Sequence, residues 1–361
     1  MMNNTITIAD RKIGAGCAPY IIAEMSANHN GDMDTAFKII EQAKLAGADA
    51  LKMQTYRPET ITIDCSKADF QIEDGLWAGK TLYELYEWAH TPWEWHQPLF
   101  EYARNVGITI FSSAFDNTAV DLLEDLDAPA YKIASFEAID LSLIKYTAST
   151  GKPLIISTGM ADADEISEAI QAARDGGCSQ LAILHCISAY PAKAEDYNLA
   201  TMVDMASRYG VVTGLSDHTL GNTTAIASVA LGASIIEKHF TLDRNGGGPD
   251  DSFSLEPTDL QELCRDSRYA WEALGRVDYG RQNSEIGNQK FRRSLYVVKN
   301  LRAGQSVTAE HVKSIRPGFG LAPKHLDTII GSIAKIDMDK GTAVEAENFA
   351  DSADLSVLLD K

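Results

Sequence analysis

The chain has 361 residues, a formal net charge of −19, 45% hydrophobic residues and 23% charged residues. This composition is ordinary for a globular protein with a sizeable core, and the negative charge argues against nucleic acids and anionic membranes as partners. No apolar run approaches the length of a membrane span, and the start of the chain lacks the features of a signal peptide, so a cytoplasmic location is expected. The five cysteines are odd in number and include no CxxC pair, which argues against a disulfide framework or a structural zinc site.

Short apolar runs, each bounded by glycine, proline or polar residues, alternate with amphipathic segments along most of the chain. The runs predict eight strands at 20–26, 50–55, 108–113, 130–135, 153–159, 181–188, 211–216 and 233–240. The segments between them predict helices, among others at 34–46, 93–105, 117–126, 163–174 and 199–208. Such a series over about 250 residues is typical of an α/β fold of the (β/α)8 TIM barrel type. A doubly wound open sheet is the competing fold, and the strand count and the lack of a dinucleotide-binding glycine pattern favour the barrel.

The sequence becomes polar after a predicted helix at 258–274. We interpret residues 276–290 as a linker. From residue 291 onward, short β-like runs alternate with turns, and a helical segment follows near 323–330. We therefore predict a barrel domain at 1–275 and a β-rich domain at 291–361 that is small for independent stability.

Polar residues end every predicted strand, and in a barrel of this kind the carboxyl ends of the strands form the active site. Taken singly, each serine or threonine is explained as well by a structural role, as a satisfied hydrogen-bond partner or a helix N-cap, as by a role in the site. In chain order these residues are Glu24, Ser26, Asn28, His29, Lys52, Gln54, Thr55, Ser112, Ser113, Lys132, Ser135, Glu137, Ser157, Thr158, Gly159, His185, Ser188, Tyr190, Ser216, Asp217, His218, Glu237, Lys238 and His239.

Three of these residues are lysines, Lys52, Lys132 and Lys238, on strands that lead to the barrel mouth. Lysines buried there need partners, because an unpaired charge in the interior is costly. An anionic ligand would supply them, with serine hydroxyls as additional donors. A purely structural lattice of salt bridges is the alternative, and we favour the anion site.

Two of the strand-end residues, His218 and His239, lie on adjacent predicted strands. Neutral imidazoles in that arrangement could share a divalent metal, with Glu24 across the mouth. Two histidines with a carboxylate and water suit Mn²⁺ or a similar ion. The alternative is that both are hydrogen-bonded core residues.

Together these segments resemble the sialic acid synthase family, whose members condense phosphoenolpyruvate with an amino sugar. Residues 294–331, with IRPGFGL at 315–321, are similar to the antifreeze-like (SAF) domain that these enzymes carry. The matching segments are AEMSANHNG (23–31), GADALKMQT (47–55), YKIAS (131–135), ISTGM (156–160), HCISAYP (185–191), GLSDHT (214–219), EKHF (237–240), GPD (248–250) and FSLEP (253–257).

Within the family, AEMSANHN and PGFGLAPKHLD are most similar to the enzymes that make pseudaminic acid from 2,4-diacetamido-2,4,6-trideoxy-L-altrose. The enzymes that make N-acetylneuraminate or legionaminate usually have AE-x-G-x-NHNG, so Ser26 stands where they have glycine. Ser188 stands where the neuraminate enzymes can offer asparagine. The alternative reading is one of those two synthases, with the same chemistry on another amino sugar.

The resemblance implies a metal-dependent condensation. C3 of phosphoenolpyruvate would attack the sugar aldehyde, which a metal on His218 and His239 would polarise, and water would attack C2 before phosphate leaves by C–O cleavage. Mn²⁺ is the expected metal, with Mg²⁺ or Co²⁺ as alternatives. The implied catalytic residues are Glu24, Lys52, Lys132, Glu137, His218 and His239, and the implied substrate-binding residues are Gln54, Ser135, Ser157, Ser188, Tyr190, Ser216, Lys238, Asp250 and Arg316.

The resemblance also implies a role for the tail. Arg316 would reach from one subunit into the barrel of the other in a domain-swapped homodimer. Without the family pattern, Arg316 is a surface charge beside the turn at Pro317.

Two other kinds of function compete with a metal-dependent synthase. A Schiff-base aldolase would use Lys132 or Lys238 as its nucleophile and would need no metal. A sugar- or phosphate-binding protein on an inactive barrel would be expected to lack the charged strand-end residues that are present here.

Overall fold

The computed structural model describes residues 5–350. The chain forms two compact units, Met1–Gly275 and Arg276–Lys361, and each is described by itself. Residues 1–4 and 351–361, which the predicted domain ranges include, lie outside the described residues. The predicted linker overlaps a 3-10 helix, η6 (Asn283–Phe291), and its exact limits stay a prediction.

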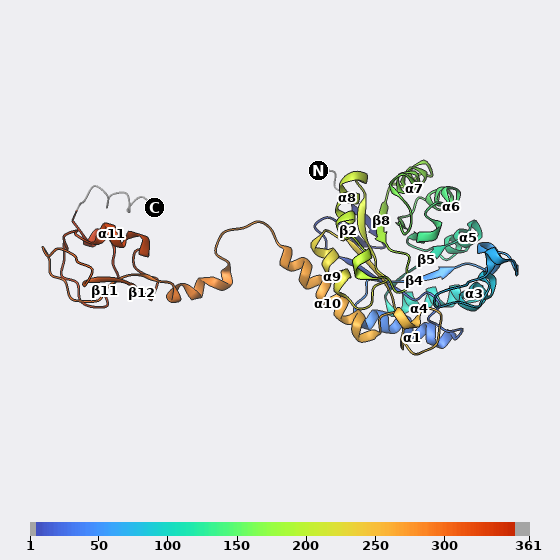
Figure 1. Ribbon diagram of the computed structural model, residues 1–361, viewed down its shortest axis with the longest axis horizontal. Coiled ribbons are helices and arrows are strands. Elements are labelled where there is room, and N and C mark those ends of the chain that lie inside the picture. Colours follow the sequence, from blue (N-terminus) through green and yellow to red (C-terminus); the bar gives the residue numbers. More distant parts are fainter. Residues whose placement is uncertain (1–4, 351–361) are drawn as a thin grey trace. The chain divides into compact units, whose positions relative to one another are not determined.

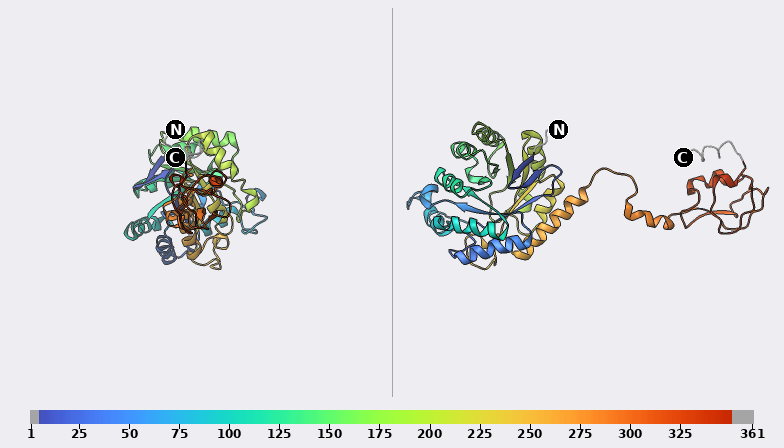
Figure 2. Two further views of the ribbon diagram at one scale, coloured as in Figure 1. Left: turned by 90° about the vertical axis from the view of Figure 1, so that its left-hand side faces the viewer. Right: turned by 180° about the vertical axis from the view of Figure 1, so that it is seen from behind.

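Eight parallel strands close into a barrel at the centre of the first unit, and helices surround them (Figures 1 and 2). The order around the barrel is β10-β3-β4-β5-β6-β7-β8-β9, so strands that follow one another in the chain are neighbours. This confirms the predicted (β/α)8 barrel. The strands are β3 (Tyr20–Glu24), β4 (Ala50–Thr55), β5 (Thr109–Ala114), β6 (Tyr131–Ile133), β7 (Leu154–Ser157), β8 (Leu181–Cys186), β9 (Val212–Ser216) and β10 (Ile235–His239).

Capping residues mark the ends of the helices. In α1 the Asp32 side chain accepts a hydrogen bond from the Thr35 amide at the start, and Gly47 takes a left-handed φ of 94° after the last turn. The helices of this unit are α1 (Met33–Ala46), α2 (Pro58–Ile61), α3 (Leu82–Ala89), α4 (His96–Val106), α5 (Asn117–Asp125), α6 (Leu141–Ala148), α7 (Ala163–Asp175), α8 (Ala200–Tyr209), α9 (Thr223–Ala230) and α10 (Pro257–Leu274), with 3-10 helices η1 (Ala68–Phe70), η2 (Trp93–Trp95), η3 (Ser135–Glu137), η4 (Ala194–Asp196) and η5 (Asp251–Phe253).

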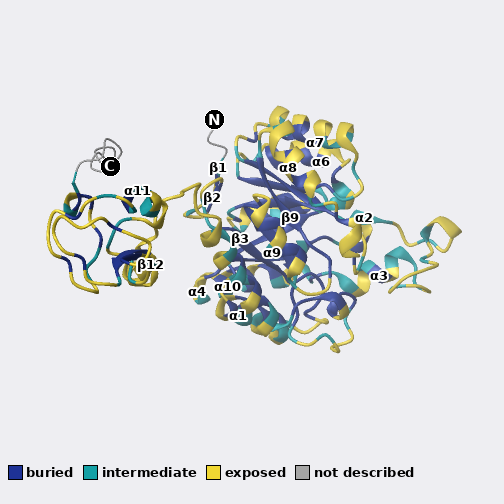
Figure 3. Ribbon diagram, turned by 60° about the vertical axis from the view of Figure 1, so that its left-hand side comes forward, coloured by how far each residue is buried: buried dark blue, intermediate teal, exposed yellow. Residues whose placement is uncertain are grey.

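Two apolar clusters build this unit. Outward strand residues such as Leu51 and Ile183 pack against helix residues such as Ile40. Inward residues such as Ile22 and Ile155 fill the barrel itself. The strands are therefore buried on both faces, while the outer faces of the helices are exposed (Figure 3). In the described part of the chain, no helix is both long enough and apolar enough to cross a membrane.

A hairpin that precedes the barrel is absent from the sequence prediction. It pairs β1 (Thr5–Ile8) with β2 (Arg11–Gly14) in antiparallel register. Its apolar residues Ile6, Ile8 and Ile13 join the cluster inside the barrel. Because this cluster also contains Tyr20, the first residue of β3, the hairpin packs at the amino end and leaves the carboxyl end open for chemistry.

The second unit is a small β-rich fold, as predicted. It pairs β11 (Ser294–Val297) with β12 (Val312–Ile315) and includes α11 (Leu326–Ile329) and the 3-10 helices η7 (Pro323–His325) and η8 (Ala346–Asn348). It has an apolar cluster of its own, separate from the two in the barrel unit.

Candidate active site

Alternation along the barrel strands decides which polar residues face the interior, because side chains two residues apart on a strand share a face. Ile22, Ala50 and Ile155 belong to the interior apolar cluster. The inward positions that follow, at the carboxyl ends of the strands, are polar. This polar layer consists of Glu24, Lys52, Ser113, Lys132, Ser157, Ser216 and Glu237, and all seven are buried.

The charged residues of the polar layer pair with one another. Lys52 Nζ lies 2.6 Å from Glu24 Oε2 and 3.7 Å from Glu237 Oε1. Lys132 Nζ lies 3.3 Å from the same oxygen of Glu237. The two lysines thus have carboxylate partners, and any incoming anion competes with Glu24 and Glu237 for the two ammonium groups.

Burial and neighbouring charges move the pKa values of this cluster in different directions. Burial raises the pKa of Glu24 even though Lys52 opposes the change. Burial has the same tendency at Glu237, but its position beside Lys132 and Lys52 lowers its pKa. Burial lowers the pKa of Lys132. Glu237 is therefore the carboxylate that stays charged most readily between the two lysines.

Hydroxyl groups also lie at the carboxyl ends of the strands, and Lys52 Nζ donates to Ser113 Oγ at 3.0 Å. Ser188 Oγ donates to Ser135 Oγ at 2.8 Å. Gly159, with φ at 51°, follows β7, and a Cβ there would lie 2.5 Å from Ser135 Cβ and 2.6 Å from Ser188 Oγ, so only glycine fits. Ser157 Oγ is buried without a hydrogen-bond partner among the described residues. These hydroxyls are suitable donors to a carboxylate or phosphate.

The predicted metal ligands His218 and His239 lie side by side, with ring centroids 5.4 Å apart. Nδ1 of His218 donates to the Ile187 carbonyl at 2.8 Å, so Nε2 is its acceptor when the ring is neutral. Burial tends to lower the pKa of His218, but the neighbouring Cys186 and the Ile187 carbonyl raise it. Nδ1 of His239 is buried without a hydrogen-bond partner in the described residues, 3.7 Å from Asp250 Oδ2. Burial and the neighbouring His218 lower the pKa of His239 well below its usual value, so its ring is neutral.

The donor set of this pair is limited to two imidazoles. Within residues 5–350, no group of three or more His, Cys, Asp or Glu side chains is spaced to hold an ion. The orphaned, neutral Nδ1 of His239 and the free Nε2 of His218 fit a divalent metal held by two protein ligands. Metal binding stays a prediction.

A cavity of about 150 Å³ opens beside His239. One wall is polar, and the other is aromatic. Glu137 lines it with one carboxylate oxygen that has no hydrogen-bond partner among the described residues, and burial raises its pKa to about 7. The lining residues are Ser26, Gln54, Tyr56, Trp77, Leu85, Tyr86, Ala89, Phe115, Ala134, Ser135, Phe136, Glu137, Tyr190, His239, Pro249 and Asp250.

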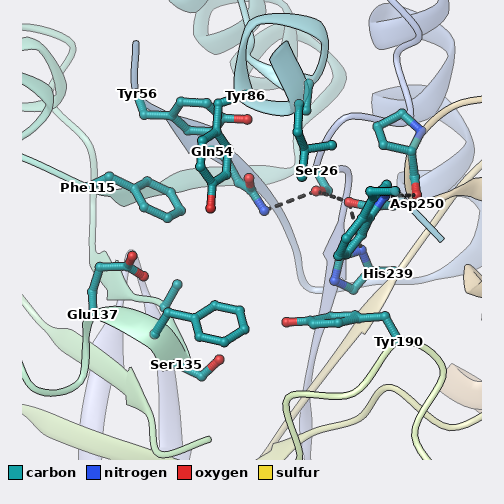
Figure 4. Close-up of a pocket in the computed structure, with 16 residues that line it drawn as sticks. Ser26, Gln54, Tyr56, Tyr86, Phe115, Ser135, Glu137, Tyr190, His239 and Asp250 are labelled. Carbon is teal, nitrogen blue, oxygen red and sulfur yellow. Dashed lines mark hydrogen bonds and ion pairs between the residues drawn. The ribbon is translucent and has the colours of Figure 1, made fainter. Parts of the chain in front are cut away.

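The polar wall is a hydrogen-bonded chain. Gln54 Nε2 donates to Glu24 Oε1 at 3.1 Å and to Ser26 Oγ at 3.0 Å. Ser26 Oγ in turn donates to Asp250 Oδ2 at 2.5 Å. Figure 4 shows Ser26 between Gln54 and Asp250, with Tyr190 and His239 beside them. Burial raises the pKa of Asp250 to about 6.

The structure does not bring Lys238 to the cluster, which corrects its prediction as a substrate contact. Lys238 follows Glu237 directly, so its side chain points to the outer face of β10. There its Nζ lies 2.9 Å from Asp217 Oδ2 and 2.7 Å from the Thr219 carbonyl. Lys238 and Asp217 thus form a buried structural ion pair beneath the helices.

Three further residues that the sequence singled out lie outside the polar layer and the cavity. Arg316 is exposed in the second unit, directly after β12, and its predicted contact with a barrel stays a prediction. Asn28 donates to the Phe240 carbonyl and to Ser254, and His29 lies against Thr91. Hydrogen bonding to neighbouring loops therefore accounts for Asn28 and His29.

The sequence prediction missed two features of the site. Glu237 was among the strand-end residues but not among the proposed site residues, although its alternation with Lys238 would have placed it inward. The aromatic wall comes from Tyr56 and Phe115, which directly follow β4 and β5, and from Tyr86 on α3. No periodic pattern in the sequence indicates that these three positions meet at one cavity.

Comparisons with known proteins identify the family of this chain. Residues 39–279 match the NeuB family and residues 292–350 match the SAF domain. A pseudaminic acid synthase of Campylobacter jejuni is 42% identical over 330 residues, covering 91% of this chain and 96% of that protein. An N,N'-diacetyllegionaminic acid synthase of Legionella pneumophila is 34% identical, covering 92% and 94%. The crystal structure of an N-acetylneuraminic acid synthetase from Leptospira borgpetersenii has a TM-score of 0.71 at 30% identity, covering 80% of this chain and 96% of that one.

Proposed function

The chain belongs to the NeuB family, and from that premise we propose that it condenses phosphoenolpyruvate with 2,4-diacetamido-2,4,6-trideoxy-L-altrose to give pseudaminic acid and phosphate. The observation that carries the proposal is the identity of 42% to a pseudaminic acid synthase across nearly the whole chain, against 34% to a legionaminic acid synthase. The competing proposal is a legionaminate or N-acetylneuraminate synthase with the same chemistry.

The polar layer supports the binding of phosphoenolpyruvate. Lys52 and Lys132 offer two buried ammonium groups, and the free hydroxyl of Ser157 adds a neutral donor. Such fixed donors stabilise charge that moves onto phosphate as the C–O bond breaks. The hydroxyls of Ser135, Ser188 and Ser216 lie on the neighbouring strand ends and complete this set.

The cavity supports an amino sugar with apolar substituents. Tyr56, Tyr86 and Phe115 form a wall that suits acetamido methyl groups and a deoxy carbon. Gln54 and Asp250 face it from the polar side and suit hydroxyl and amide groups. Glu137, with its pKa near 7, can donate or accept a proton at the same end as Ser135.

We further propose that His218 and His239 hold a divalent metal, Mn²⁺ before Mg²⁺ or Co²⁺. When bound, such an ion supplies Lewis-acid polarisation of the sugar aldehyde. The support is the pair of imidazole nitrogens available at the cavity edge, one free and one without a partner in the described residues.

We also propose that the protein acts as a domain-swapped homodimer in which Arg316 of one subunit serves the barrel of its partner. Its support is the exposed position of Arg316 in a unit that has its own core. A cytoplasmic location remains a prediction from the sequence.

The deciding experiment compares two sugars. Purified protein is incubated with phosphoenolpyruvate, Mn²⁺ and either the diacetamido-trideoxyaltrose or N-acetylmannosamine, and phosphate release is measured. We expect sugar-dependent phosphate release with the former. Turnover of N-acetylmannosamine alone would favour the competing synthase, and no release with any amino sugar would favour a binding protein.

A further inference from the structure

Ser26 has an unusual backbone conformation for its residue type. It follows β3 and takes a φ of 46°, in the left-handed region that favours glycine. Five non-glycine residues in the described part of the chain have positive φ values, and of these only Ser26 lines the cavity. A residue held in that region costs stability unless its surroundings fix it.

The side chain of Ser26 explains how the conformation is kept. Its hydroxyl accepts from Gln54 Nε2 at 3.0 Å and donates to Asp250 Oδ2 at 2.5 Å. Ser26 is only 2% exposed; its bond to Asp250 is buried, and its bond to Gln54 is partly buried. One hydroxyl therefore joins β4 to the loop after β10 across the start of the cavity (Figure 4).

Glycine at this position would take the same backbone without strain but would leave both partners unjoined. Gln54 would keep its bond to Glu24, whereas Asp250 would lose the short hydrogen bond that fixes its carboxylate. The strain at Ser26 is thus tied to the orientation of two side chains that line the cavity.

We propose that Ser26 is a positioning residue that sets the choice of amino sugar, by holding Asp250 and Gln54 in one orientation at the polar wall of the cavity. The inference rests on the proposed function, because it assumes that this cavity takes an amino sugar. No hydrogen bond joins Ser26 to Lys52 or Lys132 in the described structure, and Gln54 keeps its bond to Glu24 without Ser26, so we expect the effect of Ser26 to fall on the sugar.

The test uses Ser26→Gly and Ser26→Ala, with Ala9→Gly as the control. Ala9 has a similar φ of 49° but lies in the turn of the first hairpin, away from the cavity. For Ser26→Gly we expect kcat/KM for the preferred sugar to fall roughly 10- to 100-fold, with the KM for phosphoenolpyruvate unchanged. The kcat/KM for the less favoured sugar should fall by a smaller factor, so the ratio of the two kcat/KM values moves toward one.

The other variants separate positioning from folding. Ser26→Ala keeps the strain and loses the hydroxyl, so its melting temperature should fall below that of Ser26→Gly while its sugar ratio narrows equally. Ala9→Gly should melt at the same or a higher temperature with an unchanged ratio. If Ser26 acts through Asp250, Ser26→Gly should have little further effect on the ratio in an Asp250→Asn background.

An unchanged sugar ratio in both Ser26 variants, or full additivity with Asp250→Asn, overturns the proposal. The comparison is made with whichever two amino sugars the unaltered protein uses best. Failure of the proposed function would therefore show in the unaltered protein, and failure of this inference only in the variants.

Discussion

Replacing Glu237 with glutamine should destabilise the barrel, because Glu237 is the carboxylate that Lys52 and Lys132 share. Lys52 keeps Glu24 at 2.6 Å, whereas Lys132 forms no other ion pair within the described residues. Removing one partner of a buried pair costs about 3–5 kcal/mol. Burial already lowers the pKa of Lys132, so deprotonation relieves part of this cost. We expect the free energy of unfolding to fall by about 2–4 kcal/mol.

Urea unfolding of the chelator-treated protein, followed by circular dichroism, measures this loss. Asp217→Asn is the matched control, because it breaks the buried ion pair with Lys238 on the outer face of β10. Phosphoenolpyruvate should restabilise Glu237→Gln more than the unaltered protein, since its anionic groups replace the lost carboxylate beside Lys132. It should give no extra stabilisation to Asp217→Asn.

Two results would refute this reasoning. One is a loss below about 1 kcal/mol, which would mean that the cluster is hydrated and its charges are screened. The other is equal restabilisation of both variants by phosphoenolpyruvate, which would mean that the anion binds away from Lys132.

Four further predictions follow from the site. Burial raises the pKa of Glu137 from 4.5 in the unfolded chain to about 7, so its contribution to stability is present below pH 4.5 and is lost as the pH rises to 7. The difference in the free energy of unfolding between Glu137→Gln and the unaltered protein should therefore change by about 2–3 kcal/mol between pH 5 and 8, and a difference that stays constant with pH would contradict this. Lys238→Met should lower the melting temperature but leave the KM for phosphoenolpyruvate unchanged. A raised KM would indicate that Lys238 contacts the substrate. Chelation with EDTA should abolish turnover, and Mn²⁺ should restore it. Turnover that persists in EDTA, together with a pyruvate adduct that borohydride traps on the protein, would indicate a Schiff-base aldolase. Mixed subunits that carry Arg316→Ala and Lys132→Ala should recover activity that neither has alone, and no recovery would argue against a shared site.

The barrel itself could be predicted from the sequence because its strands are short, apolar and separated by helices of regular period. Tyr20–Glu24 and Ala50–Thr55 have the bounds that these patterns suggest, to within two residues. The first hairpin was missed although Thr5–Ile8 alternates in the manner of a strand. This hairpin depends on tertiary contacts, since Ile6 and Ile8 are buried by packing against the residues inside the barrel.

The sequence could also have predicted whether each strand-end side chain points into the barrel or outward. Lys238 and Glu237 are consecutive, so they could not both face the interior. The apolar residue two positions earlier identifies the inward one, because Ile235 belongs to the cluster inside the barrel. The aromatic wall could not be predicted, since Tyr86 on α3 and Phe115 after β5 meet at the cavity only through the tertiary fold.

The carboxylate in an otherwise apolar first strand is explained by register. Glu24 and Lys52 are Cα partners on neighbouring strands, so their side chains meet in the same layer of the barrel. Ser113 and Lys132 are partners in the same way, as are Ser216 and Glu237. A polar residue at the end of one parallel strand is thus matched by one at the end of the next, and the cost of burying each is offset across the strand boundary. Ser26 lies just beyond this regular pairing, where the chain has left the strand. Its left-handed backbone is fixed by the partners Gln54 and Asp250, which lie 28 and 224 residues away along the chain, and a local sequence pattern contains neither.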